Sequence, residues 1–273
     1  MSIITISRGS YSKGKEVAEK VSQKLGYECI SRDVLLEASE EFNVPEIKLI
    51  RAIHNSPSIL NSFTYGKEKY IVYIQAALLR HLSKDNIVYH GLAGHFFVKG
   101  VSHVLKVRII ADMDDRVRLE MEREGITREE AFHILKKDDE ERRKWSKQLY
   151  GIEMRDSSLY DLVIHIHKIT VDDTVDIICR TVGLKDFETT PGSRRTMEDL
   201  ALSAEVKAAL MDIKRGTRVS AQNGVVFVKT EAPLSQEQAL INDIEDTARK
   251  IPGVKEVKTE VVHVTRYSTP YSE

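Results

Sequence analysis

The sequence is poor in the residues that mark secreted, disulfide-stapled or membrane-spanning proteins. Its 273 residues include two cysteines, Cys29 and Cys179, each among apolar neighbours, which predicts reduced thiols in the interior and no disulfide framework or metal site. No apolar run approaches the ~20 residues that a membrane span needs. The amino-terminal stretch MSIITISRGS has no basic segment followed by a long apolar run, so we expect a cytoplasmic protein.

An excess of charge of one sign is also missing. The 41 Lys and Arg residues are balanced by 42 Asp and Glu residues, for a formal net charge of −1. This balance argues against a broad basic surface for nucleic acid. Hydrophobic residues make up 41% and charged residues 30% of the chain, as is typical of globular proteins. The length predicts one large domain or two smaller ones.

Apolar β-branched segments alternate with amphipathic ones over the first two thirds of the chain. We predict strands at residues 3–7, 27–30, 86–90, 104–111 and 161–166. We predict helices at 13–25, 32–42, 67–82, 112–150 (with a break at 125–127) and 170–182. Strands that alternate with helices in this way indicate an α/β layer structure with a mostly parallel sheet.

The composition changes after residue 184. The stretch KDFETTPGSRRT has no periodicity and is interpreted as a linker over 185–195. Beyond it, Asn223-Gly224 between apolar segments is a strong hairpin signal. A capping box is expected at Ser235-x-x-Gln238. The order of predicted elements, helix 197–211, strands 218–222 and 225–230, helix 235–250 and strand 254–264, indicates a small α+β unit of α-β-β-α-β order.

The loop after the first predicted strand has the pattern Gly9-x-x-x-x-Gly14-Lys15. A glycine-rich turn between a strand and a helix places backbone N–H groups and the helix dipole against an anion, and Lys15 would reach the β- and γ-phosphates. Glu16 stands where Ser or Thr usually holds magnesium. The alternative is a tight strand-to-helix turn that carries surface lysines.

Arginines recur among carboxylates in the charged region after residue 112, at Arg116, Arg118, Arg123, Arg142 and Arg143. Such a run is commonly a solvated helix face with i,i+4 ion pairs. Beside a phosphate-binding loop, however, the same arginines would suit a lid that closes over a phosphoryl donor.

Four segments together resemble the cytidylate-kinase-like family of P-loop nucleoside monophosphate kinases. They are ITISRGS…GKEVAEKVSQKLGY, VLKVRIIADMDDRVRLEMEREGITREEA, KKDDEERRKW…YG and DSSLYDLVIHIHKITVDDTVDII. The resemblance covers about residues 1–184. It implies a three-layer P-loop kinase fold with a parallel sheet and a helical lid at about 112–156. It also implies transfer of the γ-phosphate of ATP, with Mg²⁺, to a nucleoside monophosphate such as CMP or dCMP.

The resemblance also assigns residues to roles. The family branch carries Glu after the basic residue of its loop, as here at Glu16, and usually has Gly where this chain has Lys13. The implied nucleotide-binding residues are Ser7, Arg8, Gly9, Ser10, Ser12, Lys13, Gly14, Lys15 and Glu16. The implied catalytic residues are Lys15, Arg116, Arg123, Asp139, Arg142 and Asp161.

Two departures from the family pattern lie on the acceptor side. Ser31 stands where the family commonly has Asp, and Gly91-Leu92 stands where it commonly has Gly-Arg. The arginine of that pair helps to hold the acceptor in the family. Leu92 cannot pair with a phosphate. Two alternatives stay open for a neighbouring histidine, which either takes the place of the arginine or is purely structural. The candidate acceptor residues are Ser31, Asp33, His90, Gly91 and Leu92, with His95 beside them.

The C-terminal segment RVSAQNGVVFVKTEAPLSQEQALINDIEDTARKIPGVKEVKTEVV resembles a BON domain, over residues 196–266. The resemblance implies a module that binds surfaces or partner proteins. The plainer interpretation is a regulatory or oligomerising appendage, and a homo-oligomer is compatible with it. Three functions stay open: a monophosphate kinase, a non-catalytic nucleotide sensor that signals through the C-terminal unit, and a kinase for another small acceptor.

Overall fold

The computed structural model describes residues 2–9, 12–31, 33–43, 60–91 and 94–263. The chain divides into two compact units, Met1–Met197 and Glu198–Glu273. No helix within the described ranges is both long and apolar enough to cross a membrane.

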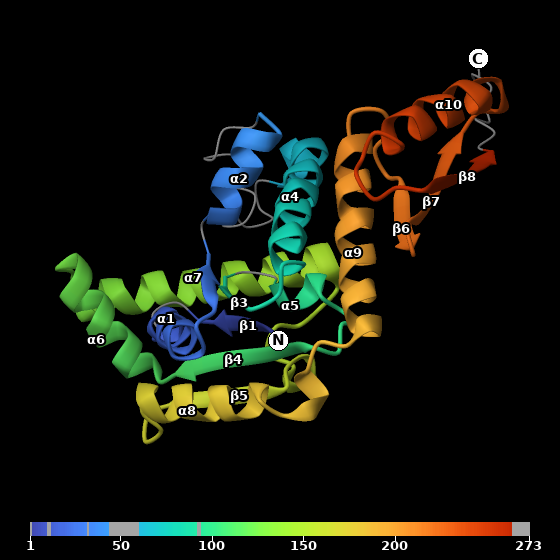
Figure 1. Cartoon of the computed structure of the whole chain (residues 1–273). Coiled ribbons are helices and arrows are strands. Elements are labelled where there is room, and N and C mark those ends of the chain that lie inside the picture. Colours follow the sequence, from blue (N-terminus) through green and yellow to red (C-terminus); the bar gives the residue numbers. More distant parts are fainter. Residues whose placement is uncertain (1, 10–11, 32, 44–59, 92–93, 264–273) are drawn as a thin grey trace, which may run out of the picture. The chain divides into compact units, whose positions relative to one another are not determined.

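The first unit is built on a five-stranded parallel sheet of order β2-β3-β1-β4-β5, visible in Figure 1. The strands are β1 (Ile3–Arg8), β2 (Glu28–Ile30), β3 (Ile87–His90), β4 (Val104–Ala111) and β5 (Leu162–Ile166). In register, Ile6 lies opposite Val107, and Arg108 lies opposite Val163. The prediction of a parallel α/β sheet is confirmed.

Two helices pack on one face of this sheet through an apolar core. Helices α1 (Gly14–Leu25) and α8 (Val171–Val182) contribute Val17, Val21, Val175 and Ile178, which pack with strand residues such as Leu105. Both helices repeat apolar residues at intervals of three or four, which gives each an apolar face. The other face carries α4 (Leu60–Leu82), with α2 (Asp33–Glu41) and the short α5 (Gly94–Phe97). In Figure 1, α8 lies below the sheet and α4 above it.

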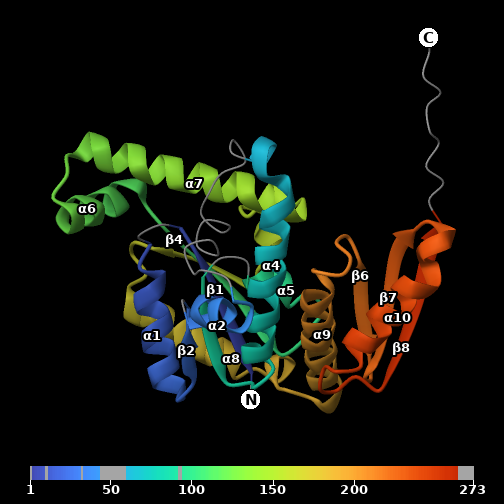
Figure 2. The same cartoon turned by 90° about the horizontal axis from the view of Figure 1, so that it is seen from above.

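The predicted lid is a helical hairpin. Helix α6 (Met113–Glu124) ends at Gly125 with φ 67°, and α7 (Arg128–Tyr150) follows after three residues. Thr127 and Glu130 form the predicted capping box. A small apolar cluster of Val117, Ala131 and Leu135 joins the two helices, and Figure 2 shows them running back along each other. A short 3₁₀ turn, η2 (Ser157–Leu159), precedes β5.

The predicted irregular linker at 185–195 is partly helical. It contains the 3₁₀ turn η3 (Lys185–Phe187) and the start of α9 (Pro191–Leu210), so α9 begins six residues before the predicted helix start. Thr190 and Ser193 bond reciprocally, at 3.0 and 3.1 Å, between each backbone N–H and the other's hydroxyl. Pro191 suits the first helical position. These capping hydrogen bonds therefore stabilise a helix start in a segment whose composition is typical of loops.

The second unit carries a three-stranded sheet of order β6-β7-β8. Strands β6 (Arg218–Gln222) and β7 (Val225–Ala232) form the predicted hairpin, in which Asn223 and Gly224 both have positive φ. Strand β8 (Glu256–His263) pairs parallel to β7. The capping box predicted at Ser235 is wrong, because Ser235 lies in the turn η4 (Leu234–Gln236) and α10 (Glu237–Ala248) begins after it without a side-chain cap.

Candidate functional site

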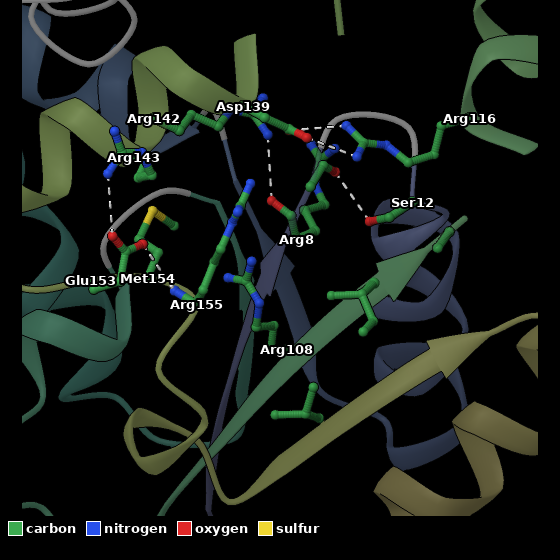
Figure 3. Close-up of a pocket in the computed structure, with 14 residues that line it drawn as sticks. Arg8, Ser12, Arg108, Arg116, Asp139, Arg142, Arg143, Glu153, Met154 and Arg155 are labelled. Atoms are coloured by element: carbon green, nitrogen blue, oxygen red, sulfur yellow. Dashed lines mark hydrogen bonds and ion pairs between the residues drawn. The ribbon is translucent and has the colours of Figure 1, made fainter. Parts of the chain in front are cut away.

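A pocket of about 330 Å³ lies in the first unit, beside the end of β1. Its floor is one face of β4 and β5, and its roof comes from α7 and the segment that follows this helix (Figure 3). Six arginines and two carboxylates line it, which makes it strongly cationic. They are Arg8, Arg108, Arg116, Arg142, Arg143, Arg155, Asp139 and Glu153.

The alternation of side chains along β4 decides which residues form the floor of the pocket. Leu105, Val107 and Ile109 are buried in the core with α1 and α8, so the residues between them face the other way. Arg108 and Ile110 are thereby presented to the pocket. The side chain of Val163, opposite Arg108 on β5, completes this floor.

Arg116 and Asp139 join the two lid helices across the pocket. The guanidinium of Arg116 donates to both carboxylate oxygens of Asp139, at 2.8 and 2.9 Å, and only 9% of its side chain is exposed. The same group lies over Gly9, where an added β-carbon would be 3.6 Å from Arg116 Cζ. A bidentate pair of this kind fixes the plane of the guanidinium. Arg116 is therefore held in place above the loop.

The loop itself brings backbone close to the arginines. A β-carbon on Gly14 would lie 2.7 Å from both Cβ and Cδ of Arg8, so Arg8 packs directly against the start of α1 only because Gly14 has no side chain. Ser12 donates to the Gly9 carbonyl at 3.1 Å. Lys13 has φ 60°, a left-handed conformation that suits Gly better, and the family pattern places Gly there.

Helix α7 and the segment after it also contribute to the pocket. Arg142 Nη1 donates to the Arg8 carbonyl at 3.4 Å. Arg143 pairs with Glu140 at 2.8 Å and lies 3.6 Å from Glu153, and it lowers the pKa of Glu140 to about 2. The buried hydroxyl of Ser146 donates to the Ile152 carbonyl at 3.1 Å. This contact holds the segment that carries Glu153 to Arg155 against α7.

A buried polar network supports the pocket from below. The hydroxyl of Tyr160 donates to the Met154 carbonyl at 3.1 Å and accepts from Arg108 Nη1 at 3.2 Å. His95 Nε2 lies 3.2 Å and Ser7 Oγ 3.4 Å from the same hydroxyl. Burial, together with the positive charges of Arg108 and Lys106, lowers the pKa of His95 to about 3. His95 is therefore a neutral group that contacts Tyr160, and Tyr160 links β1, β4 and the segment that carries Glu153 to Arg155.

Several predicted site residues line the pocket and others do not. Those that line it are Arg8, Gly9, Ser12, Arg116, Asp139 and Arg142. Lys15 instead points along α1, 66% exposed and 3.6 Å from Glu19, and Glu16 pairs with Lys20 at 3.3 Å. Arg123 is half-exposed and pairs with Glu124 at 2.7 Å. These three side chains lie on helix faces that are solvated, as the plainer reading of a charged helix predicts.

Asp161 bonds to the backbone of β4 and does not line the pocket, and its catalytic role stays a prediction. Its carboxylate accepts the Lys106 backbone N–H at 2.8 Å, and its own N–H donates to the Lys106 carbonyl at 2.8 Å. These two bonds set the register at the start of the β4–β5 pair. Asp161 thus lies directly before β5, at the start of this strand.

The acceptor-side residues are only partly described. Ser31 directly follows β2, and His90 ends β3 with a buried side chain. Gly91 packs on Tyr89, whose hydroxyl would lie 2.5 Å from an added β-carbon. Asp33 begins α2, but its side chain, together with Ser10 and Leu92, lies outside the described residues. None of the described acceptor candidates lines the arginine pocket.

Sequence reasoning missed Arg108, Arg155 and Glu153 as pocket residues. Arg108 carried a signal, because Lys106 and Arg108 alternate with buried apolar residues in VLKVRIIA and so share one face of the strand. Arg155 and Glu153 carried none, since the turn after α7 is fixed by tertiary contacts.

The profile of the cytidylate kinase-like family matches residues 3–168, well over half of the chain. The chain belongs to the cytidylate kinase-like family. The cytidylate kinase of Pyrococcus furiosus is 33% identical over 113 residues, which is 41% of this chain and 58% of that protein. The chain thus spans less than two thirds of that relative's length.

Two further comparisons cover nearly the whole length of the matched protein. The cytidylate kinase of Archaeoglobus fulgidus is 28% identical over 190 residues, which is 68% of this chain and 97% of that protein. A crystal structure of an uncharacterized protein from Eubacterium ventriosum superposes with a TM-score of 0.50 at 21% identity, covering 67% of this chain and 98% of that one. At this identity the superposition shows a shared fold alone.

Proposed function

We propose that the protein transfers the γ-phosphoryl group of ATP to a nucleoside monophosphate, CMP or dCMP in the first instance. The arginine pocket carries this proposal. Phosphoryl transfer spreads negative charge over the transferring oxygens, and catalysis depends on positioning and electrostatic stabilisation of that charge. Arg116 and Arg142 from the lid meet Arg8 from the end of β1 at one pocket, as such a reaction needs. Family membership supports the kinase class.

The residues present fit the phosphates of ATP better than they fit a metal held by the protein. Arg8, Ser12 and the backbone around Gly9 would hold phosphate oxygens, with Arg116 and Arg142 above them. Both carboxylates of the pocket, Asp139 and Glu153, lie within 4 Å of an arginine. Mg²⁺ would then be held chiefly by the nucleotide and by water, which it commonly retains. When bound, ATP supplies the group to be transferred.

The exposed position of Lys15 favours a second candidate function, a nucleotide sensor without turnover. A lysine that pairs with Glu19 on the helix surface gives no support to transfer unless it turns towards the phosphates. A kinase for another small acceptor is the third candidate, supported by Ser31 and Leu92 in place of the family's Asp and Arg.

For the second unit we propose a BON-like binding module, in a cytoplasmic protein. The observed α-β-β-α-β order supports this assignment. One face of its sheet presents Phe227, with Lys258 Nζ 5.7 Å from the ring centroid. Binding of a surface or a protein, homo-oligomer formation included, suits such a mixed face better than catalysis does.

The test is an acceptor panel with matched variants. Purified full-length protein is incubated with ATP, MgCl₂ and each of CMP, dCMP, UMP, AMP and GMP, and ADP formation is measured. We expect turnover with CMP or dCMP and loss of at least ~100-fold in Arg142→Ala. Lys144→Ala, on the same helix but outside the pocket, is the control and should keep the wild-type rate. ATP binding without turnover for any acceptor would contradict the proposal and favour the sensor.

A further inference from the structure

Two aspartates and two histidines gather beyond the pocket, at the carboxyl ends of β4 and β5. Asp112 follows β4, and Asp115 lies in the first turn of α6. His165 is in β5 and His167 follows it. Because residues i and i+2 of a strand share a face, His165 continues the face that presents Val163 to the pocket, and His167 lies in the turn that follows the strand. Figure 1 shows β4 turning into α6 at this edge.

Three of these side chains converge as ligands of one ion would. Asp112, Asp115 and His167 each place one ligand atom within 4.8 Å of the others. His167 Nδ1 lies 3.2 Å from Asp112 Oδ2 and 3.7 Å from Asp115 Oδ2. Around a divalent metal with bonds of ~2.1 Å, neighbouring donor atoms lie ~3.0–3.4 Å apart. Small movements of exposed side chains would therefore complete the set.

The groups around this triad suit a metal site. His165 Nε2 lies 3.1 Å from Asp112 Oδ1, the oxygen that does not face His167. A partner on the outer oxygen orients a ligating carboxylate. Arg118 pairs with Asp115 Oδ1 at 2.9 Å and leaves Oδ2 towards His167. The nearby Asp114 is directed away and pairs with Arg128 at 2.6 Å.

We propose that Asp112, Asp115 and His167 form a binding site for a borderline divalent metal such as Zn²⁺, with water completing the coordination. Mixed carboxylate and imidazole ligands favour Zn²⁺ over Mg²⁺, which takes oxygen ligands. The site is separate from the arginine pocket and does not depend on the proposed kinase activity. It differs from the sequence-based expectation, which included no metal site.

The proposed metal site lies at the first turn of α6, where the lid begins. The carbonyl of Asp112 accepts the backbone N–H of Arg116 at 3.1 Å, which forms the first turn of α6. A metal that links this turn to the end of β5 would fix the base of the lid one helical turn before Arg116. We therefore expect bound metal to reduce amide exchange at residues 113–117.

The experiment is a calorimetric titration of ZnCl₂ into tag-free full-length protein at pH 7.5, in buffer without chelators. We expect saturable binding at one site and at least a tenfold loss of affinity in His167→Ala, and likewise in Asp115→Asn. His165→Ala should lose about tenfold, as loss of an orienting partner does. The control is His133→Ala, an exposed position on α7, which should bind as wild type does.

Three results would overturn the metal site. One is the absence of saturable Zn²⁺ binding, which would leave the cluster as contacts between aspartates and histidines. Another is unchanged binding in His167→Ala, because it would place the ion elsewhere. The third comes from the cysteines. A Cys29→Ser/Cys179→Ser variant should bind Zn²⁺ as wild type does, and loss of binding in it would assign the ion to the thiols. Circular dichroism of each variant checks that the half-exposed substitutions leave the fold intact.

Discussion

The two faces of β4 and β5 differ in the side chains that they present. One face presents Leu105, Val107, Ile109, Ile164 and Ile166 to α1 and α8, and all five are buried. The other presents Arg108, Ile110 and Val163 to the pocket, and His165 to the aspartate cluster. Side chains of a strand alternate between its two faces with a period of two residues. The same strands therefore contribute core residues on one face and pocket residues on the other.

This division explains how a charged pocket stands on a parallel sheet. Parallel strands that are buried on both faces are usually apolar throughout. Here only one face of β4 and β5 is wholly apolar. The other face carries Arg108 beside Ile110 and Val163 and is covered by the arginines of α7 and of the segment after it. Substitutions on the two faces should therefore separate loss of folding from loss of function.

The largest effect is expected on the polar side, at Arg116. In Arg116→Ala, ADP formation from ATP and CMP should fall ~100- to 1,000-fold, because a positioned donor to the transferring phosphoryl group is lost. Arg118→Ala, two residues away and 68% exposed on its side chain, is the matched control and should change the rate less than about twofold. Equal rates in the two variants would remove Arg116 from the site.

Substitutions of the neighbouring residues Ile109 and Ile110 compare the two faces of β4 directly. Ile109→Ala should lower the free energy of unfolding of the first unit by about 3 kcal/mol, because it opens a cavity in a fully buried core. Ile110→Ala, on the pocket face, should cost about 1 kcal/mol or less. Urea unfolding followed by the fluorescence of Trp145, the one tryptophan of the chain, gives both values. A larger cost at Ile110 would contradict the assignment of the faces.

The buried His95 makes the polar side sensitive to acid. Its folded pKa of about 3 lies below the ordinary value of 6.5, so its contribution is complete above pH 6.5 and is lost as the pH falls towards 3. The cost is about 2 kcal/mol at pH 5. Burial also lowers the pKa of His103, which acts in the same direction.

A variant isolates this contribution. We expect His95→Gln to reduce the difference in unfolding free energy between pH 7.5 and pH 5 by about 2 kcal/mol. His133→Ala, at an exposed position, should leave the difference as in wild type. If His95→Gln also leaves it unchanged, His95 is not held neutral by burial.

The smallest effect is expected from one hydroxyl on each side of the sheet. Tyr160→Phe should lower the free energy of unfolding by about 1–2 kcal/mol, since His95 and Arg108 lose a buried partner. Tyr27→Phe, which removes a single contact with Ser2 at 3.0 Å, should cost less than about 1 kcal/mol. The same urea titrations measure both losses. A larger loss in Tyr27→Phe than in Tyr160→Phe would place the main polar network elsewhere.

Local signals in the sequence were enough for most elements of the fold. The Thr127 capping box, the Asn223-Gly224 hairpin and strand 104–111 were all predicted and confirmed, because each depends on neighbours in sequence. Helix α5 was missed, since four residues carry no periodicity. The failed cap at Ser235 shows that a capping pattern does not act where the chain enters a 3₁₀ turn first.

The candidate site was less predictable than the fold. The resemblance brought together Arg8, Gly9, Arg116, Asp139 and Arg142, and the structure places all five around one pocket. It also proposed Lys15, Arg123 and Asp161, which lie outside that pocket. Whether a side chain points into a site depends on helix rotation and on competing partners such as Glu19 and Glu124, and the order of residues does not specify these.

The most direct test of the account is hydrogen–deuterium exchange with and without ATP and MgCl₂. The central claim is that the polar face of β4 and β5, closed by the loop and the lid, binds the nucleotide. It predicts slower exchange with ATP in peptides covering 8–16, 106–111 and 139–155, and no change in 175–182 on the apolar side. Unchanged exchange in the first three segments at saturating ATP, or protection confined to residues 198–263, would contradict it.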